Sequence, residues 1–504
     1  MNVTRLLHTV RYLKPVQVYG RLWRPKPRVR KGATIDLRAR TGPWSPPIPK
    51  ANPQTGPNRF QFLNQERDIR SWNDAGVPKL WLYHLHYFDC PNLELIEGWS
   101  RDNPWGQGNG WEPYPLSLRI CNWIKWALEG NFLPETALQS LSQQAEYLAQ
   151  SMEFHLLANH LFVNAKALVF AGRFFSGPAA DRWLRAGLKV LEGQIPEQIL
   201  HDGGHFERSP MYHALVLEDI LDLVNLIRTY PDAIASDAER MWIEAGGRMA
   251  GWLTQICHPD GEISFFNDAA IGIAPTLAEV TAYAQRLGVQ PSPGRFAESG
   301  YVRLENESAV VIFDAGPVGP DYQPGHAHAD TLSFELSIRG RRAVVNSGTS
   351  TYENNSQRLY QRGTSAHNTA RVDGIDQSEV WSAFRVARRA RPVDVQTDNC
   401  NFAEAGHTGY LRLKDPVLHR RRLELRSGAL SVTDIFEARQ SHELELFFHL
   451  HPDADVALML DARLSRWVEE TAWFPEFNRS ILNKTIIGRW GGRLPVRFTT
   501  LITW

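Results

Sequence analysis

The sequence predicts a two-domain protein in which an array of helices precedes an antiparallel β-sandwich. Three observations favour this fold class. The 504 residues exceed what one ordinary hydrophobic core accommodates. Apolar residues recur at helical spacing through roughly the first half, and later they alternate with the two-residue period of strands. We therefore expect an N-terminal arm and strap over residues 1–75, a helical domain over 76–295 and a sandwich over 296–504.

The N-terminal segment has its own composition. Residues 5–40 are dense in Arg and Lys, and Asp36 is almost their only acid. Such a segment can meet a membrane surface, an anionic polymer or the protein's own acidic face. We expect a partly ordered arm packed on the first domain. Residues 41–60 are rich in Pro and Gly, which predicts an extended strap.

Amphipathic helices are predicted by apolar stripes with spacings of three and four residues. The clearest stripe comprises Leu138, Leu141, Ala145, Leu148 and Met152. Three further stripes begin at Leu161, Leu217 and Met249, and short Gly, Pro or polar breaks separate them. Successive helices with short connections indicate an antiparallel array.

Strands are predicted where the period changes to two. Leu332, Phe334, Leu336 and Ile338 alternate with polar residues, as in a half-buried strand. Residues 444–450 repeat this alternation, and shorter apolar runs lie between these segments. Charged turns and glycines punctuate the runs, which is typical of an antiparallel sandwich.

Composition excludes several functional classes. Lys and Arg together equal Asp and Glu, at 55 each, so net charge gives no reason to expect a nucleic-acid partner. The four cysteines are far apart, which argues against a disulfide scaffold and a thiolate zinc site. No stretch approaches the roughly 18 apolar residues of a transmembrane segment.

Three polar clusters interrupt the apolar pattern. They are Asn159-His160, residues 202–213 and residues 325–330, and the last is followed by Tyr352 and His367. Ser209-Pro210 is a good helix start, which would put Tyr212 and His213 in a first turn. Taken singly, each histidine is more often a hydrogen-bonded structural residue than a catalytic one.

Together these segments resemble the heparinase II/III-type polysaccharide lyases. The resemblance is carried by W-E-P-Y-P-L-S-L-R-I-C-N-W from Trp111, N-H-L-F-V-N-A from Asn159, D-G-G-H-F-E-R-S-P-M-Y-H from Asp202, G-H-A-H-A-D-T-L-S-F from Gly325, and A-H-N-T from Ala366 with the following V-D-G-I-D-Q-S-E. It implies an incomplete α/α toroid joined to an antiparallel β-sandwich. It also implies β-elimination on an acidic, uronate-containing polysaccharide such as heparan sulfate or alginate.

Eliminative cleavage removes the C5 proton of a uronate and expels the 4-linked oxygen, so the uronate carboxylate must be neutralised. Asn159 is the best candidate for that task because an amide donates hydrogen bonds without competing for the proton, and His160 can assist. By resemblance Tyr212 is the acid, and either Tyr212 or His326 is the base. Arg208 and His213 are close enough in sequence to make Tyr212 more acidic. We expect substrate contacts from Trp111, Arg208, His213 and Tyr352.

The resemblance requires no cofactor for the reaction, but it implies a structural zinc ion in the sandwich. His328 and His367 would be ligands, together with an Asp from the following strand. This sequence has Asn346 at that position, and an amide is a poorer ligand for a divalent ion. If the metal is present, we expect it to hold the loop that carries His326.

Two other functions compete with a lyase. His326 and His328 could belong to a metal-dependent hydrolase, although Thr331 stands where its usual motif has another His. The chain could also be an inactive glycan-binding protein. The resemblance implies a periplasmic location, but Arg11, Lys14 and Pro15 interrupt any signal-like apolar run, which leaves the cytoplasm as the alternative. The sequence makes no prediction of oligomeric state.

Overall fold

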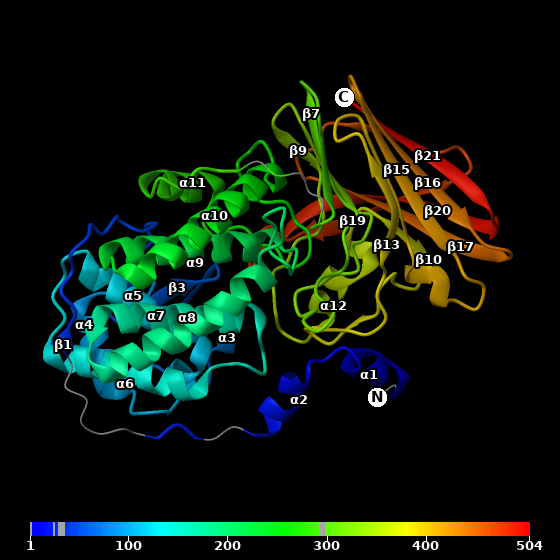
Figure 1. The fold of residues 1–504 in the computed structure, drawn as a ribbon. Coiled ribbons are helices and arrows are strands. Elements are labelled where there is room, and N and C mark those ends of the chain that lie inside the picture. The colour runs from blue at the N-terminus through cyan, green and yellow to red at the C-terminus, as the bar shows by residue number, and fades with distance from the viewer. Residues whose placement is uncertain (1–2, 24–25, 29–35, 293, 295–297) are drawn as a thin grey trace.

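The structure, a computed structural model, describes residues 3–23, 26–28, 36–292, 294 and 298–504. Helices dominate the chain as far as residue 286, and antiparallel sheets dominate from residue 301 (Figure 1). The predicted fold class, a helical toroid followed by a β-sandwich, is therefore confirmed.

The helical domain is built around one fully enveloped helix, α7 (Ala158–Phe174). Every residue of α7 except His160 is buried, because α5 and α8 pack on it from different sides. The other helices of this domain complete the toroid: α3 (Lys79–Tyr87), α4 (Leu93–Asp102), α5 (Pro113–Leu128), α6 (Glu135–Ser151), α8 (Pro178–Gln198), α9 (Pro210–Thr229), α10 (Ala233–Ile256) and α11 (Leu277–Arg286). Within the described part of the chain, no helix has the length and apolar character needed to cross a bilayer.

Helix starts decide where polar side chains of this domain lie. Ser209 is the N-cap of α9, Pro210 is its first residue, and the Ser209 side chain accepts a hydrogen bond from the Tyr212 amide at 3.2 Å. The sequence prediction that Tyr212 lies in a first turn is thus confirmed. Asn159 lies in the first turn of α7, after Leu157 and Ala158, which both have positive φ. Both helices present polar side chains at their N-terminal ends.

The N-terminal segment is more ordered than the sequence predicted. It contains α1 (Val3–Val10), α2 (Pro15–Leu22), β1 (Asp36–Leu37), which pairs with β5 (Phe175–Ser176), and a small sheet of β2 (Gln54–Gly56), β3 (Arg59–Phe62) and β4 (Gln65–Asp68). The arm does not pack on the first domain alone. Lys14 pairs with Glu197 of α8, and the Trp381 indole donates to Thr9 from the sandwich. Residues 24–25 and 29–35 of the basic segment lie outside the described residues.

The sandwich consists of two antiparallel sheets that share one hydrophobic core. One sheet has the order β19-β20-β17-β9-β8-β7-β6, with β10 paired to β17, and the other has the order β13-β14-β15-β16-β21-β18. The first comprises β6 (Tyr301–Glu305), β7 (Ala309–Asp314), β8 (Phe334–Ile338), β9 (Arg341–Val344), β10 (Ala370–Val372), β17 (Ser441–Leu450), β19 (Ser465–Trp473) and β20 (Ile481–Arg493); the second comprises β13 (Pro392–Thr397), β14 (Phe402–His407), β15 (Leu418–Arg426), β16 (Ala429–Glu437), β18 (Ala457–Met459) and β21 (Val496–Thr503). A short helix, α12 (Ser356–Arg362), and a two-stranded ribbon of β11 (Val380–Trp381) and β12 (Arg385–Val386) lie in the connections.

The outer face of β8 joins the two domains. The sequence predicted a half-buried strand, but every residue of β8 is buried. Its polar side chains face the end of the helical domain, where Glu335 accepts from the backbone amide of Phe265 at 3.1 Å and lies 2.9 Å from His258. The predicted alternation of apolar and polar residues is therefore confirmed. The polar face of β8, however, packs against the helical domain and not against water. This interface brings the loop after α10 next to the loop before β8.

A candidate active site at the domain junction

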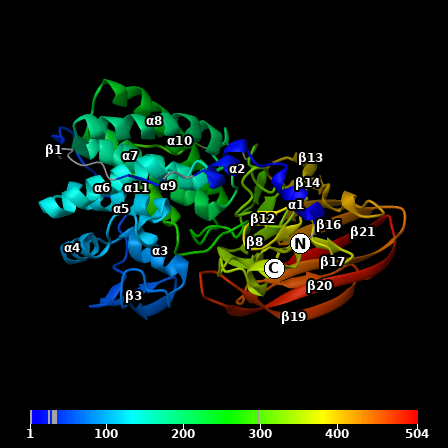
Figure 2. The same ribbon diagram turned by 90° about the horizontal axis from the view of Figure 1, so that it is seen from below.

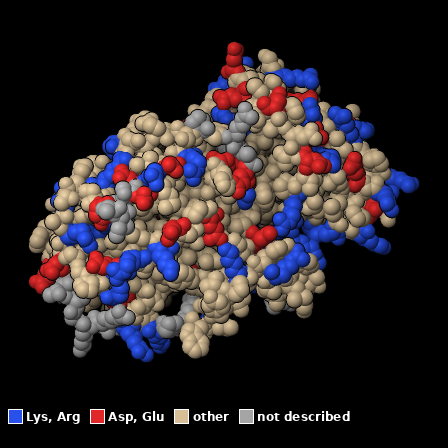
Figure 3. Space-filling view, in the orientation of Figure 1, with Lys and Arg blue, Asp and Glu red and all other residues tan. Residues whose placement is uncertain are grey.

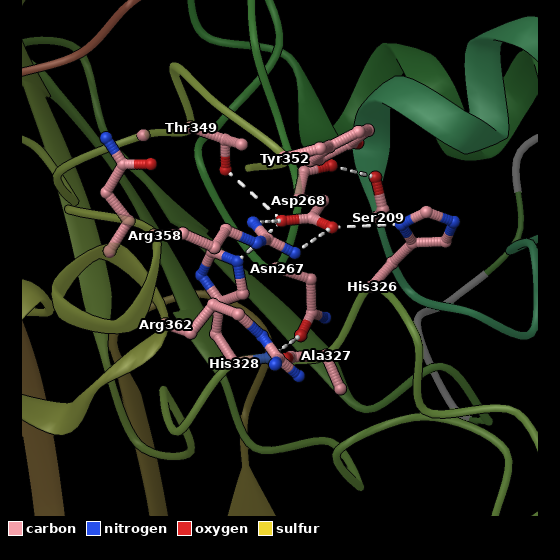
Figure 4. Close-up of polar contacts among 12 residues, drawn as sticks. Ser209, Asn267, Asp268, His326, Ala327, His328, Thr349, Tyr352, Arg358 and Arg362 are labelled. Atoms are coloured by element: carbon pink, nitrogen blue, oxygen red, sulfur yellow. Dashed lines mark hydrogen bonds and ion pairs between the residues drawn. The ribbon is translucent and has the colours of Figure 1, made fainter. Parts of the chain in front are cut away.

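A buried carboxylate, Asp268, lies at the centre of the junction (Figure 4). Its two oxygens contact both terminal nitrogens of Arg358, with Nη2 donating to Oδ2 at 2.8 Å. His326 Nδ1 lies 2.9 Å from Oδ2, His328 Nε2 lies 2.8 Å from Oδ1, and the Thr349 hydroxyl reaches Oδ1 at 3.4 Å. Burial alone would raise the pKa of Asp268, but Arg358 and the two imidazoles outweigh it and hold that pKa well below its usual range.

Asp268 positions the two histidines that the sequence singled out. Residues 326–330 lie in the loop before β8, so regular strand geometry does not align the two rings. Instead, His326 and His328 contact different oxygens of the same carboxylate. His328 is fully buried, whereas the His326 side chain keeps 12% of its surface exposed. His326 is therefore the histidine of this pair that a ligand can reach.

Tyr212, from the helical domain, meets His326, from the sandwich. The two rings stack with centroids 3.9 Å apart and an interplanar angle of 30°. The Tyr212 hydroxyl lies 3.0 Å from the hydroxyl of Tyr352, whose ring lies 6.0 Å from that of His326. Burial, followed by the neighbouring Tyr352 and Tyr114, raises the pKa of Tyr212 well above its ordinary value. Tyr212 is thus a protonated phenol at neutral pH.

Asn159 and His160 approach the same region from α7. The Asn159 side-chain oxygen is buried and has no hydrogen-bond partner among the described residues. The His160 side chain is 30% exposed, and its Nδ1 lies 3.0 Å from a carboxylate oxygen of Glu153. Burial opposes protonation of His160, but Glu153, with Glu207 and Glu112, outweighs it and raises the pKa of His160. This helix end therefore places a buried amide oxygen without a partner beside an imidazole whose pKa is raised.

Glu207 connects the two halves of the site. Its carboxylate lies 3.8 Å from His326 Nε2. The charges of His326 and His160 and the backbone amide of Asn159 all act to lower the pKa of Glu207. Both carboxylate oxygens are buried and lack a hydrogen-bond partner within the described chain. Burial is the largest effect and raises the pKa of Glu207. Glu207 therefore lies between His326 of the sandwich and the end of α7 that carries Asn159 and His160.

Two predicted substrate-binding residues lie elsewhere. The Arg208 guanidinium donates to the backbone oxygens of Phe206 and Ser299, at 2.9 and 3.0 Å. The His213 ring is fully buried and bonds through Nε2 to the Met249 carbonyl at 2.9 Å. Burial lowers the pKa of His213 to about 3, so this ring is neutral. Both side chains are thus buried and bonded to backbone carbonyls, which argues against the expectation that they bind substrate and acidify Tyr212.

Trp111 is also placed differently from the prediction. It is 3% exposed, and its indole nitrogen donates to the Asn103 carbonyl at 3.3 Å. Its ring packs against Trp99, Trp105 and Tyr147. Trp111 therefore belongs to the hydrophobic core and not to a sugar-binding surface, whereas Tyr352 does lie beside Tyr212.

A potential metal-binding group lies behind the site. His328, Asp330 and His367 are buried, and one ligand atom from each lies within 4.8 Å of the other two. His328 Nδ1 and both nitrogens of His367 lack hydrogen-bond partners in the described structure. Asn346 does not join this group, because its side-chain oxygen accepts from the Asn368 backbone amide at 3.0 Å. Asp330 thus supplies the carboxylate that Asn346 lacks.

Sequence reasoning missed Asp268, Glu207, Arg358 and Asp330 as site residues. Glu207 and Asp330 lie inside the polar clusters, but no spacing rule distinguishes them from their neighbours. Asp268 follows Asn267 in a loop, and Arg358 lies on a short helix of the sandwich. Only the contact between the two domains brings Asp268 and Arg358 together.

Two family models match the chain. The model described as heparinase II/III N-terminus matches residues 125–290, and that described as heparinase II/III-like, C-terminal matches residues 289–484. The chain is 26% identical over 320 residues to a heparin-sulfate lyase of Pedobacter heparinus, covering 55% of this chain and 46% of the lyase. It is also 26% identical over 429 residues to FtsZ-localized protein C of Caulobacter vibrioides, covering 76% and 69% of the two chains. The chain spans about half the length of the heparin-sulfate lyases it matches.

Solved structures share the fold. The heparan sulfate lyase HepC from Pedobacter heparinus superposes with a TM-score of 0.58 at 19% identity, over 88% of this chain and 81% of that one. A heparinase III structure gives a TM-score of 0.64 at 17% identity, over 84% and 76%. At these identities the likeness extends to the fold alone.

The ion pair between Glu153 and His160 predicts a pKa change. In the Glu153→Gln variant the carboxylate that most favours the imidazolium is gone, while burial, Glu207 and Glu112 remain, so the pKa of His160 should fall. Histidine NMR titration, with the signal assigned from a His160→Gln variant, measures this shift. The exposed carboxyl Glu192 provides a control, and Glu192→Gln should leave the titration unchanged. An unchanged His160 titration in Glu153→Gln would refute the assigned cause.

Proposed function

We propose, since the chain belongs to the heparinase II/III family, that it is a polysaccharide lyase that cleaves a uronate-containing polymer by β-elimination. One observation carries the proposal. The phenol of Tyr212 from the helical domain and the imidazole of His326 from the sandwich are in ring contact, with centroids 3.9 Å apart, and Glu207 links His326 to the N-terminal end of α7, which carries Asn159 and His160. An acid, a base and a carboxylate-binding group therefore lie together, as elimination requires.

Tyr212 is proposed as the acid that protonates the leaving oxygen. Its raised pKa keeps the proton on the phenol at neutral pH. The hydroxyl of Tyr352, 3.0 Å away, orients that proton and can stabilise the phenolate that forms when Tyr212 donates it. The same raised pKa disfavours Tyr212 as the base.

His326 is proposed as the base that removes the C5 proton. Its Nδ1 faces the ionised Asp268 carboxylate at 2.9 Å, so Nδ1 carries the hydrogen and donates it. The lone pair of a neutral imidazole is then at Nε2, the nitrogen that faces Glu207 at 3.8 Å. Asp268 would also stabilise the imidazolium formed when His326 takes the proton, as a carboxylate does in other histidine dyads.

Asn159 and His160 are proposed to neutralise the uronate carboxylate. The C5 proton is too weakly acidic to remove unless the developing enolate is stabilised, and loss of one such donor costs about 10²–10³ in rate. The raised pKa of His160 keeps its imidazolium populated above pH 6.5. An acidic polymer is therefore the substrate class that this helix end suits.

A structural divalent metal, zinc by its ligand set, is proposed at His328, Asp330 and His367. His328 Nε2 donates to Asp268, which leaves Nδ1 to face an ion, and histidine ligands of zinc commonly donate their other ring N–H to a carboxylate in this way. A bound ion would fix His328 and, through the shared Asp268, the orientation of His326. All three ligands are buried, so the group is suited to a structural role and not to catalysis.

One of the two alternative functions retains specific support. A hydrolase that uses both His326 and His328 as metal ligands is disfavoured, because the residues placed to hold one ion are His328, Asp330 and His367, and His326 is not among them. A non-catalytic role is favoured by a single observation: the relative matched over most of its length is FtsZ-localized protein C. An assay for unsaturated products distinguishes this role from a lyase.

The acid assignment predicts the behaviour of Tyr212→Phe. This variant keeps the ring contact with His326 and loses only the hydroxyl, so turnover should fall at least about 10²-fold. Turnover is followed by the ultraviolet absorbance of unsaturated uronate on a panel of heparan sulfate, alginate and other uronate polymers. Tyr230→Phe, at the far end of the same helix, should keep wild-type turnover.

Two results would contradict the lyase proposal. One is full turnover by Tyr212→Phe, which would remove its role as acid. The other is a wild-type protein that produces no unsaturated product from any polymer of the panel. Polymer binding without product would then support the non-catalytic alternative.

The metal proposal predicts about one zinc ion per chain in protein purified without chelators. His367→Ala should lose that ion and unfold at a lower temperature, because a ligand bound only by the folded state stabilises it. Elemental analysis and thermal unfolding measure both effects independently of activity. His451→Ala changes a histidine outside the group and should keep the metal. A wild-type protein whose unfolding temperature does not respond to added zinc would refute the site.

A further inference from the structure

The two N-terminal helices expose large apolar side chains on their outer faces. On α1 these are Val3, Leu7 and Val10, which lie four and three residues apart and so form one stripe. On α2 and its C-cap they are Val18, Tyr19, Leu22 and Trp23, of which Leu22 is 84% and Trp23 81% exposed. Soluble proteins rarely expose such groups together unless the surface binds something.

The same segment carries the strongest charge asymmetry of the chain. Its first 35 residues contain nine Lys and Arg and no Asp or Glu. Because the whole chain is neutral, residues 36–504 have nine more acidic than basic side chains. On the face shown in Figure 3, acidic and basic side chains are interspersed over both domains. The arm therefore combines apolar and purely basic character.

Contacts on the inner faces of the helices hold this arrangement in place. Gln17, 1% exposed, donates to the Tyr322 carbonyl at 3.0 Å, and the Arg389 guanidinium lies 4.1 Å from the centre of the Tyr12 ring. The Trp381 indole donates to the Thr9 hydroxyl at 3.1 Å. Seen from below, α1 and α2 lie on the near surface of the molecule (Figure 2). Their apolar faces thus point away from the body that anchors them.

We propose that α1 and α2 bind the surface of an anionic membrane. Amphipathic helices with an apolar face and flanking Lys and Arg insert that face between lipid headgroups, while their cations attract acidic lipids. Tyr19 and Trp23 suit this boundary because each has an apolar ring and a polar atom. The acidic remainder of the chain would be repelled by such a surface, so the arm sets the orientation of the bound protein.

Other binding partners fit the two helices of the arm less well. In a symmetric dimer through this face, two basic, acid-free segments would lie against each other and repel. An acidic polysaccharide would use the cations but leave Leu7, Leu22 and Trp23 in water. Anionic lipid is the partner class that satisfies both properties.

Vesicle co-sedimentation of the full chain tests the proposal, and it requires no lyase activity. Vesicles of phosphatidylcholine alone are compared with vesicles that also contain phosphatidylglycerol. Wild-type protein should sediment with the anionic vesicles, less so at high salt, and much less with the neutral ones. A variant with Leu7→Gln, Leu22→Gln and Trp23→Gln should bind the anionic vesicles at least about tenfold more weakly.

A matched control uses exposed apolar residues of the sandwich. Trp467, Val468 and Leu482 are 52%, 54% and 74% exposed, and glutamine at all three should leave vesicle binding unchanged. The proposal is overturned if wild-type protein ignores anionic vesicles, or if the arm variant and the control bind equally. It is also overturned if light scattering shows that the arm substitutions only convert a dimer to a monomer.

Discussion

The ion pair between Asp268 and Arg358 is the contact on which the rest of the junction depends. Both groups are buried, and burying two charges is costly unless every oxygen and nitrogen of the pair is satisfied. Here the two imidazoles of His326 and His328 and the Thr349 hydroxyl complete the shell around the carboxylate. Because Asp268 lies in the helical domain, between α10 and α11, and Arg358 belongs to the sandwich, the pair fixes one domain against the other.

That constraint explains how the proposed catalytic residues can be divided between two domains. The helical domain supplies Asn159, His160 and Tyr212 from the first turns of α7 and α9. The sandwich supplies His326 and Tyr352 from loops, which alone would have little reason to hold one orientation. Asp268 gives His326 a fixed orientation and a defined tautomer, and it also contacts His328, a ligand of the proposed metal site. In the proposed chemistry, the hydrogen bonds of Asp268 therefore hold His326 in place, and the loop itself need not be rigid.

The sequence predicted best those features that depend on a single helix or strand. Ser209-Pro210 located Tyr212 in a first turn, because capping is a local property of the chain. Side-chain direction is not local, and for that reason Arg208 and Trp111 were assigned to the substrate although both are turned into the core. Alternation identified β8, yet it did not reveal that the helical domain covers the polar face of that strand.

Hydrogen exchange in an Asp268→Asn variant tests most directly whether this carboxylate organises the site. An amide cannot satisfy Arg358 and both imidazoles, so exchange should accelerate at least about tenfold in peptides covering residues 324–331 and 356–366. The α6 peptide, residues 135–151, should exchange as in the wild type. Wild-type exchange in the first two segments, or equal acceleration in all three, would contradict the account.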